Sequence, residues 1–199
     1  MGKQLIISVG SEFGSGGHEI AEKLAKNYGL PLLDHNLLDE IAAEREHIDV
    51  EELRNLDEKR GSFGFSRSVK GFSSSLHENI SLMQFEYLQE RAATGESFVI
   101  VGRCSEDVLK EYDGLVSIFV LGDKEVKRAR IMKKYELPQN LAERLMHEKD
   151  TKRKRYHNNF CEGKWGDSRN YDVSINSSVL GIDQTVEILI DFIDRKHNM

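Results

Sequence analysis

The 199-residue sequence has little of what builds disulfide-stapled, membrane-spanning or nucleic-acid-binding proteins. It contains only two cysteines, Cys104 and Cys161, which match no zinc-binding spacing and make no convincing disulfide framework. No apolar run approaches the roughly 20 residues that cross a bilayer. Leu5–Val9 is too short for the core of a signal peptide. The formal net charge is −6, so no global positive field attracts a nucleic acid. These absences favour a cytoplasmic protein with neither a membrane nor a nucleic-acid partner.

Short apolar runs alternate with amphipathic segments, which is the order typical of parallel α/β proteins. Five runs predict strands: Leu5–Val9, Pro31–Leu33, Phe98–Val101, Val116–Leu121 and Tyr171–Ile175. Helical spacing predicts helices over 20–28 and 37–42, around Val126 and Ala129, from Asn140 with Glu143 completing a capping box, and over 186–193. We therefore expect an α/β fold with a five-stranded parallel sheet and helices on both faces.

A glycine-rich segment, Ser11–His18, follows the first predicted strand and leads into a helix. Such a turn lets backbone N–H groups converge on an anion, and the helix N-terminus adds partial positive charge. The phosphate-binding pattern G-x-x-x-x-G-K-[ST] is degraded here, because Gly17 stands at the lysine position and His18 at the hydroxyl position. A dinucleotide fingerprint beginning at Gly14 and a turn without a ligand remain as alternatives. A phosphate cradle is the favoured interpretation.

Two other segments stand apart from the α/β pattern. Gly61–Ser75 is rich in Ser, Gly and Phe and predicts a flap or loop. Lys149–Lys164 is strongly basic, and cations three or four residues apart share one face of a helix. A basic run by itself is usually a solvated surface. Beside a phosphate cradle, it is better interpreted as a lid that closes over transferring phosphates.

The order of the motifs resembles the cytidylate kinase-like branch of the nucleoside monophosphate kinases. The resemblance rests on the glycine loop with "FGSGG", on "LPLLDHNLLDEIA", "VIVGRC" and "VKRARIMKK", on the basic lid, and on "NYDVSINSS" with the helix after it. It implies a single domain with the P-loop three-layer α/β/α fold. The expected core comprises residues 1–60, 95–135 and 168–199, with an acceptor flap over about 35–95 and a lid over about 136–167.

The resemblance also implies a role for individual residues. Donor phosphates would be held by Ser11, Phe13, Gly14, Ser15, Gly16, Gly17 and His18, with Arg130 stacking on the adenine and Lys134 reaching a phosphate. Asp34 and Arg103 would contact the acceptor. Asp150 and Arg153 reproduce the family's acid-x-x-Arg spacing in the lid, and Arg155 is a further lid cation that could replace the absent loop lysine. Asp34 could instead simply cap the helix that follows it.

No metal-ligating set is predicted, because six histidines show no metal spacing and are expected at the surface: His35, His47, His77, His147, His157 and His197. Trp165 and Tyr171 are expected to pack at the end of the lid.

The resemblance implies an ATP- and Mg²⁺-dependent kinase that phosphorylates CMP or dCMP, and that could form a homo-oligomer. Two alternatives stay open: a kinase for another small-molecule acceptor, and a non-catalytic nucleotide-binding protein. The second follows from Gly17, since losing a preorganised cation can cost about two to three orders of magnitude in rate.

Overall fold

The computed structural model describes residues 3–34, Leu37 and residues 76–198. Within them the elements follow in the order β1 (Ile6–Ser11), α1 (Gly17–Tyr28), β2 (Leu32–Leu33), α4 (Leu76–Ala93), β3 (Phe98–Val101), α5 (Ser105–Val108), β4 (Leu115–Leu121), α6 (Lys124–Tyr135), α7 (Gln139–Phe160), a 3₁₀ helix (Ser168–Asn170), β5 (Val173–Asn176) and α8 (Ser177–His197).

The five strands form one parallel sheet in the order β2-β3-β1-β4-β5, which confirms the predicted fold class. β1 is central: Ile6 pairs with Phe98 of β3 on one side and with Leu115 of β4 on the other. Residues 6–10 of β1 are all buried, as expected for a strand covered on both faces. The predicted strand boundaries agree with the observed ones to within about two residues.

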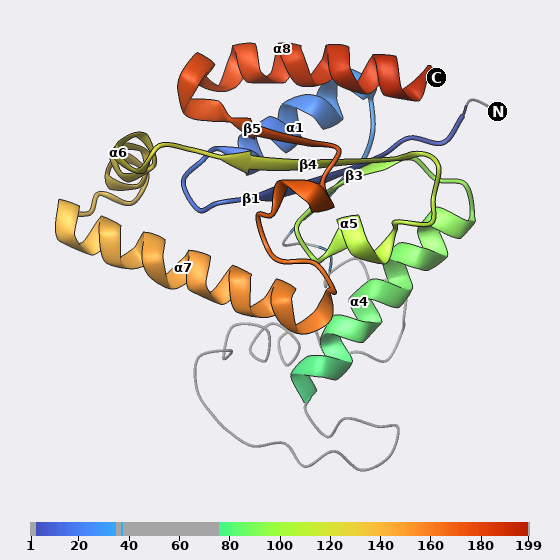
Figure 1. Cartoon of the computed structure of the whole chain (residues 1–199), viewed down its shortest axis with the longest axis horizontal. Coiled ribbons are helices and arrows are strands. Elements are labelled where there is room, and N and C mark those ends of the chain that lie inside the picture. The colour runs from blue at the N-terminus through green and yellow to red at the C-terminus, as the bar shows by residue number, and fades with distance from the viewer. Residues whose placement is uncertain (1–2, 35–36, 38–75, 199) are drawn as a thin grey trace.

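Helices cover both faces of the sheet (Figure 1). α1 and α8 lie on one face, where Ile20 and Leu24 pack with Leu189 and Ile193. α4, α5 and α7 lie on the opposite face, and Tyr87 of α4 joins a second apolar cluster there. This three-layer arrangement buries the apolar residues of α1 and α8 against one face of the sheet and those of α4 against the other.

Two details of the helices correct the sequence prediction. α7 begins at Gln139 after Pro138, and no side chain caps it, so the predicted capping box is wrong. The Glu143 carboxylate instead accepts from Arg128 (2.7 Å) and Gln139 (3.4 Å). In α6 the expected core residue Val126 is exposed, and Lys127 is buried in its place. The ion pairs that permit this burial lie in the glycine loop.

Part of the predicted acceptor side falls outside the described residues. This applies to the flap Gly61–Ser75 and, apart from buried Leu37, to the helix expected over 37–42. α4, which occupies the last part of the expected flap region, was not recognised from the sequence. The helix has almost no separate apolar face, because the polar residues Ser81 and Gln84 are buried along with Ile80 and Leu88.

The carboxyl ends of β1 and β3 lie side by side in the sheet, because Val9 pairs with Val101. The glycine loop follows β1 directly, and Gly102 and Arg103 follow β3. In open parallel sheets, ligands bind outside the carboxyl ends of the strands. The fold therefore brings the predicted donor loop and the predicted acceptor arginine to one edge. In the part of the chain that the structure describes, no helix is both long and apolar enough to cross a membrane.

Candidate active site

A cavity of about 1000 Å³ opens at this edge of the sheet. Its lining includes most of the predicted site residues: Ser11, Phe13, Gly14, Gly16, Gly17, His18, Asp34, Arg103, Arg130, Lys134 and Arg153. Three predicted residues do not belong to this lining. Ser15 is buried inside the loop, Asp150 lies behind it, and Arg155 is exposed on α7.

The glycine loop leads from β1 into an uncapped helix. Gly16 precedes α1 with a φ of 86°, a left-handed conformation that favours glycine, and no side chain caps the helix N-terminus. The first N–H groups of any helix have no intrahelical acceptor. Ser15 maintains the turn: its hydroxyl donates to the Glu12 carbonyl (2.8 Å), and its own carbonyl accepts from the Ser177 hydroxyl (2.6 Å). Ser15 thus shapes the loop and does not face the cavity.

The absence of a lysine at position 17 has a steric cause. A Cβ atom at Gly17 would lie 2.3 Å from the Cβ of Ser11, which is far inside van der Waals contact. In the phosphate-loop pattern the first position is glycine and the seventh is lysine. Here the small and large residues are exchanged, because Ser11 occupies the glycine position and Gly17 the lysine position. As long as Ser11 is present, a side chain at position 17 has no room without a shift of the loop.

A buried lysine supports the loop from behind. The Lys127 ammonium of α6 lies 2.8 Å from the Glu12 carboxylate and 3.7 Å from that of Asp150. Asp150 in turn accepts a 2.7 Å hydrogen bond from the Phe13 backbone N–H. Burial raises the pKa of Asp150, against the lowering effects of the Phe13 N–H and of Lys127. The predicted lid acid Asp150 therefore positions the loop. Lys127 of α6 also supports the loop, and the sequence analysis did not single it out.

Two arginines approach the loop from neighbouring helices. Arg153 of α7 donates to the Ser11 carbonyl at 2.7 Å, and its guanidinium lies 5.6 Å from the centre of the Phe13 ring. Arg130 of α6 lies within 2.9 Å of the place that a Cβ of Gly16 would take, and it pairs with Glu19 at 3.1 Å. Both guanidiniums line the cavity. The structure thus places two cations beside a loop that lacks its own lysine.

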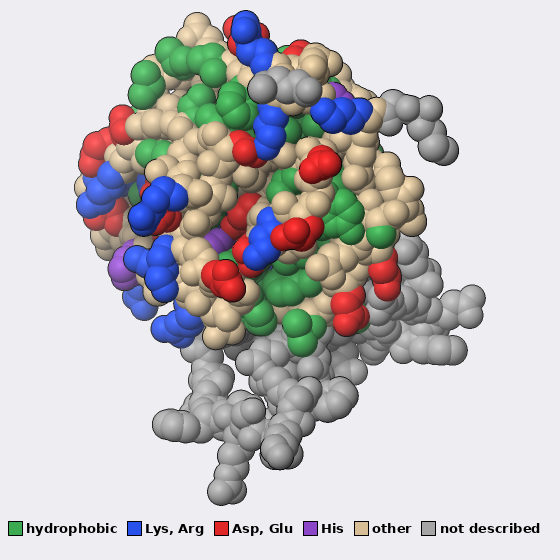
Figure 2. Space-filling model, turned by 45° about the vertical axis from the view of Figure 1, so that its right-hand side comes forward, with side chains coloured by type: hydrophobic (Ala, Val, Ile, Leu, Met, Phe, Trp, Pro, Cys, Tyr) green, Lys and Arg blue, Asp and Glu red, His purple; other side chains and the backbone are tan. Residues whose placement is uncertain are grey.

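The rest of the basic segment is partly neutralised by its neighbours. Lys152 pairs with Glu148 at 2.8 Å, and in the neighbouring helix α6 Arg128 likewise pairs with Glu125 and Glu143. Figure 2 shows that Lys and Arg side chains gather at the left of this face with Asp and Glu side chains among them. Arg153 differs from these cations, since its contacts are with the loop.

The other end of the cavity holds Asp34 and Arg103. Asp34 follows β2, is buried, and lies 3.6 Å from His18, which also approaches Glu22 at 3.3 Å. The backbone carbonyl of Asp34 also accepts a hydrogen bond from the Leu37 N–H. Arg103 and Cys104 follow Gly102 with φ values of 60° and 55°. Two consecutive non-glycine residues in the left-handed region are a form of backbone strain that is common at functional sites.

A cluster of reactive side chains forms the floor of the cavity. His157 of α7 is buried and lies 2.5 Å from the Glu106 carboxylate of α5, so the prediction that it is a surface residue was wrong. Tyr171 donates to the same carboxylate at 3.2 Å. Although burial lowers the pKa of His157, its contacts with Cys161 and Glu106 raise it to about 10.

The two cysteines meet in this cluster. Both are free and buried, and the proximity of the two thiols raises the pKa of Cys104 and lowers that of Cys161 to about 7. They are 57 positions apart in sequence, so no spacing rule could have paired them.

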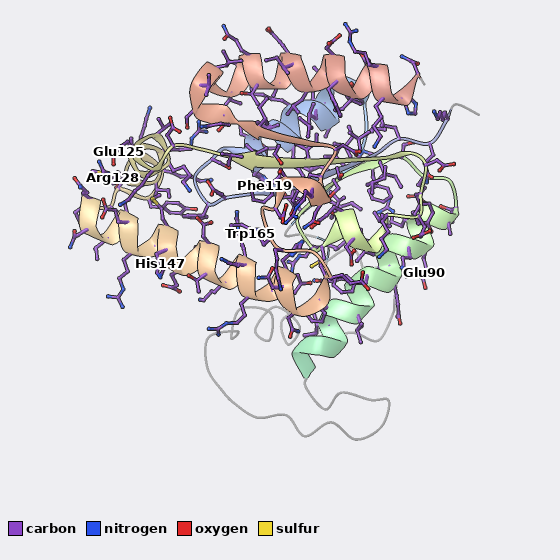
Figure 3. All side chains as sticks on the ribbon, viewed as in Figure 1. Glu90, Phe119, Glu125, Arg128, His147 and Trp165 are labelled. Carbon is purple, nitrogen blue, oxygen red and sulfur yellow. The ribbon has the colours of Figure 1, made fainter. Side chains whose placement is uncertain are left out.

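The end of the lid packs as the sequence predicted. Phe119 of β4 contacts Trp165 at 5.4 Å and Tyr171 at 5.0 Å between ring centres. Figure 3 shows Phe119 and Trp165 between the sheet and α7. This aromatic contact fixes the segment that follows α7.

Comparison with known proteins identifies the family. A model of the cytidylate kinase-like family matches residues 6–179, which is most of the chain. The chain belongs to the cytidylate kinase-like family. The match begins in β1 and ends in the first turn of α8, so it includes the glycine loop, both arginines and the cluster of Glu106, His157 and Cys161.

Solved structures agree with the family on the fold. The chain is 36% identical to an uncharacterized protein from Eubacterium ventriosum, covering 96% of this chain and 99% of that one with a TM-score of 0.76. A gluconokinase from Sinorhizobium meliloti is similar over 100% of this chain and 96% of its own, with 15% identity and a TM-score of 0.57. A shikimate kinase from Bacteroides thetaiotaomicron is similar over 96% and 98%, with 14% identity and a TM-score of 0.56.

No curated protein matches the chain. The fold is that of the P-loop kinases, and the family together with the fold supports a kinase-type phosphotransferase.

Proposed function

We propose that this protein transfers the γ-phosphoryl group of ATP to a nucleoside monophosphate, with CMP or dCMP as the acceptor. One observation carries the proposal: the uncapped N-terminus of α1 and the guanidiniums of Arg130 and Arg153 line the same cavity as Arg103. Phosphoryl transfer requires positioning and charge neutralisation more than covalent chemistry by the protein.

The donor end suits a triphosphate. Backbone N–H groups at a helix N-terminus bind phosphate oxygens, and an arginine binds phosphate in a bidentate manner. Arg153 would move from the Ser11 carbonyl to the transferring phosphoryl group, because a charged acceptor is stronger than a neutral carbonyl. Arg130 would remain beside the start of α1. These two cations would supply the charge that a lysine supplies in the usual loop.

Magnesium fits this donor end with few protein ligands. Mg²⁺ commonly keeps several waters and binds one or two carboxylates together with substrate phosphates. Position 18 carries His18 where the pattern has a hydroxyl, and His18 lies toward Asp34 and Glu22. The ion would therefore be held mainly by ATP oxygens and water, and it would neutralise charge on the donor.

The acceptor end suits a phosphate group. Arg103 lies after β3 in a strained conformation at the cavity wall, where it would orient an acceptor phosphate. A monophosphate is already ionised near neutral pH, so its attack on the γ-phosphorus needs no general base. The choice of CMP and dCMP comes from the family resemblance alone.

A hydroxyl acceptor is the second candidate, and Asp34 is the observation that favours it. Its carboxylate is buried in the cavity wall and could accept the proton that a hydroxyl loses on attack. Two structurally similar proteins are described as a gluconokinase and a shikimate kinase. At their low identity, this likeness concerns the fold.

The test is ADP release from ATP and Mg²⁺ with a panel of acceptors: CMP, dCMP, UMP, AMP, GMP, TMP, gluconate and shikimate. Turnover selective for CMP or dCMP would support the proposal. Turnover only with a hydroxyl acceptor would replace it with the second candidate. ATP binding without turnover on any acceptor would favour a non-catalytic nucleotide-binding protein.

A further inference from the structure

Three ligand-type side chains converge beneath the cavity. Atoms of the Glu106 carboxylate, the His157 imidazole and the Cys161 thiol all lie within 4.8 Å of one another, and all three residues are buried. Among the described residues this is the one group of three with such geometry. Its members come from two places in the fold: Glu106 lies in the first turn of α5, and His157 and Cys161 lie at the end of α7.

The chemistry of these donors selects a class of ion. One sulfur, one imidazole nitrogen and one carboxylate oxygen suit Zn²⁺ and related transition-metal ions, whereas Mg²⁺ and Ca²⁺ prefer oxygen ligands alone. Zinc holds such atoms at about 2.0–2.3 Å from itself. Two ligand atoms of one zinc ion are therefore less than about 4.6 Å apart. The three ligand atoms here lie within 4.8 Å of one another, which is close to that separation. The cluster has the donor set and the size of a zinc site.

Charge balance also favours an ion here. A thiolate at Cys161, a carboxylate at Glu106 and a neutral imidazole at His157 sum to −2, which one divalent cation cancels. A buried site without net charge avoids the large cost of burying an isolated charge. The His157 imidazole and the Glu106 carboxylate are joined by a 2.5 Å hydrogen bond, whose proton a bound cation would displace.

The surroundings supply the outer contacts of a metal site. Tyr171 donates to the Glu106 carboxylate at 3.2 Å, and Cys104 contacts the Cys161 sulfur through its own thiol. Partners of this kind orient ligands and tune their basicity. Glu106 and His157 also line the cavity, so an ion bound between them would be accessible from it. Three protein ligands and one open position are the arrangement of zinc sites that bind water or a substrate oxygen.

We propose that Glu106, His157 and Cys161 bind one zinc-class divalent cation, with a fourth coordination position open to the cavity. The ion would join the end of α7 to the start of α5 next to Arg103. His157 lies one helical turn after Arg153, so the site would hold the cationic face of α7 against the acceptor wall. This proposal concerns ion binding, and it stands whether or not CMP is the acceptor.

The test uses the full chain, purified with a chelator and kept reduced, and titrated with Co²⁺ and then Zn²⁺ without nucleotide. The expected result is one Co²⁺ per chain, visible d–d bands of a four-coordinate ion and one thiolate-to-cobalt charge-transfer band, all displaced by Zn²⁺. A chain that binds neither ion, or an octahedral Co²⁺ spectrum without the charge-transfer band, would overturn the proposal. So would an intact mass two hydrogens lower, from a Cys104–Cys161 disulfide that persists under these conditions.

Variants separate the ligands from their surroundings. Cys161→Ser should remove the charge-transfer band and lower affinity by more than about a hundredfold, and Glu106→Gln and His157→Gln should each weaken binding strongly. Tyr171→Phe should weaken it by about tenfold while keeping the band. His147→Gln, an exposed histidine on the same helix, is the matched control and should leave binding unchanged. Because the wild-type spectrum alone reports thiolate ligation, a variant that fails to fold does not remove the test. Binding that survives both Cys161→Ser and His157→Gln would place the ion elsewhere and overturn the assignment.

Discussion

The two walls of the cavity are built in different ways. The loop wall, Ser11–His18, is one continuous segment, and under the proposed function its backbone N–H groups would bind the donor phosphates. The opposite wall joins Asp34, Arg103, Glu106 and His157, which come from three separate places in the chain. The first is a local structure that tolerates an exchange such as that between Ser11 and Gly17. The second depends on how α5 and α7 pack against the sheet, so no motif of consecutive residues predicts which side chains meet there.

Arg153 contacts the loop wall from α7, the helix that also carries His157 of the opposite wall, and its removal should have the largest effect. Under the proposed kinase function, Arg153→Ala should lower kcat by about a hundredfold to a thousandfold, since one preorganised cation at the transferring phosphoryl group is lost. Steady-state ADP release with the preferred acceptor measures this change. Arg144→Ala removes an exposed arginine from the same helix and should leave kcat unchanged. Equal activity of both variants would remove Arg153 from the reaction.

The loop wall should depend on its buried lysine. Lys127→Met keeps the aliphatic stem but leaves Glu12 and Asp150 without their shared cation, which should cost about 3 kcal/mol of unfolding free energy. Urea unfolding followed by circular dichroism measures the loss. Lys124→Met removes an exposed lysine of α6 and should cost almost nothing. If both variants lose the same stability, Lys127 does not support the loop.

The Ser11–Gly17 exchange can be tested with a double-mutant cycle. Gly17→Ala should destabilise the protein by about 2 kcal/mol, because its Cβ would overlap the Ser11 side chain. In a Ser11→Gly background the same change should be neutral or stabilising, since alanine favours a helix more than glycine does. Thermal unfolding of the four proteins gives the coupling. Additive effects would show that steric overlap does not explain Gly17.

The smallest effect should come from Tyr28, which ties the loop helix α1 to α8. Its hydroxyl donates to Asp194 at 2.8 Å and contacts the Ile190 carbonyl at 3.3 Å. Tyr28→Phe should therefore cost about 1 kcal/mol of unfolding free energy. Burial, together with Asp194, raises the pKa of Tyr28 above its ordinary value of 10.0.

The unfolded chain therefore loses the Tyr28 proton first as pH rises, and this favours unfolding. The advantage of the wild type over Tyr28→Phe should be constant below pH 10. Above it, the advantage should decrease as pH rises, by less than about 1.4 kcal/mol per pH unit because solvent screens this partly exposed pair. Urea unfolding at several pH values between 8 and about 11 measures this. A difference that does not change with pH would contradict the assignment of the Asp194 contact.

Several elements could be predicted because their signals are local. The five strands are short apolar runs bounded by turn residues, and the glycine loop lies between a strand and a helix in consecutive residues. The position of α7 followed from its periodicity, although its first turn did not. Pro138 precedes the helix, and Glu143 is engaged by Arg128 from α6, which no local capping rule includes.

Other features could not be predicted, because their partners are distant in sequence. Nothing local in the sequence distinguishes Lys127 from the other cations of α6, and only the fold places Glu12, 115 positions away, against it. His157 appeared to be a surface histidine, and only the packing of α7 on α5 buries it against Glu106. Arg155 belongs to the same basic run as Arg153, yet it lies outside the cavity lining.

By itself the sequence determined the fold class, the strand order along the chain and the place of the glycine loop, because hydrophobic periodicity and glycine turns act over a few residues. The tertiary structure decided which charged and sulfur-bearing side chains share one cavity. It brought Cys104 to Cys161 and Glu106 to His157 by closing contacts between segments about 50 positions apart. Those contacts depend on helix packing across a sheet, and packing is a property of the whole fold.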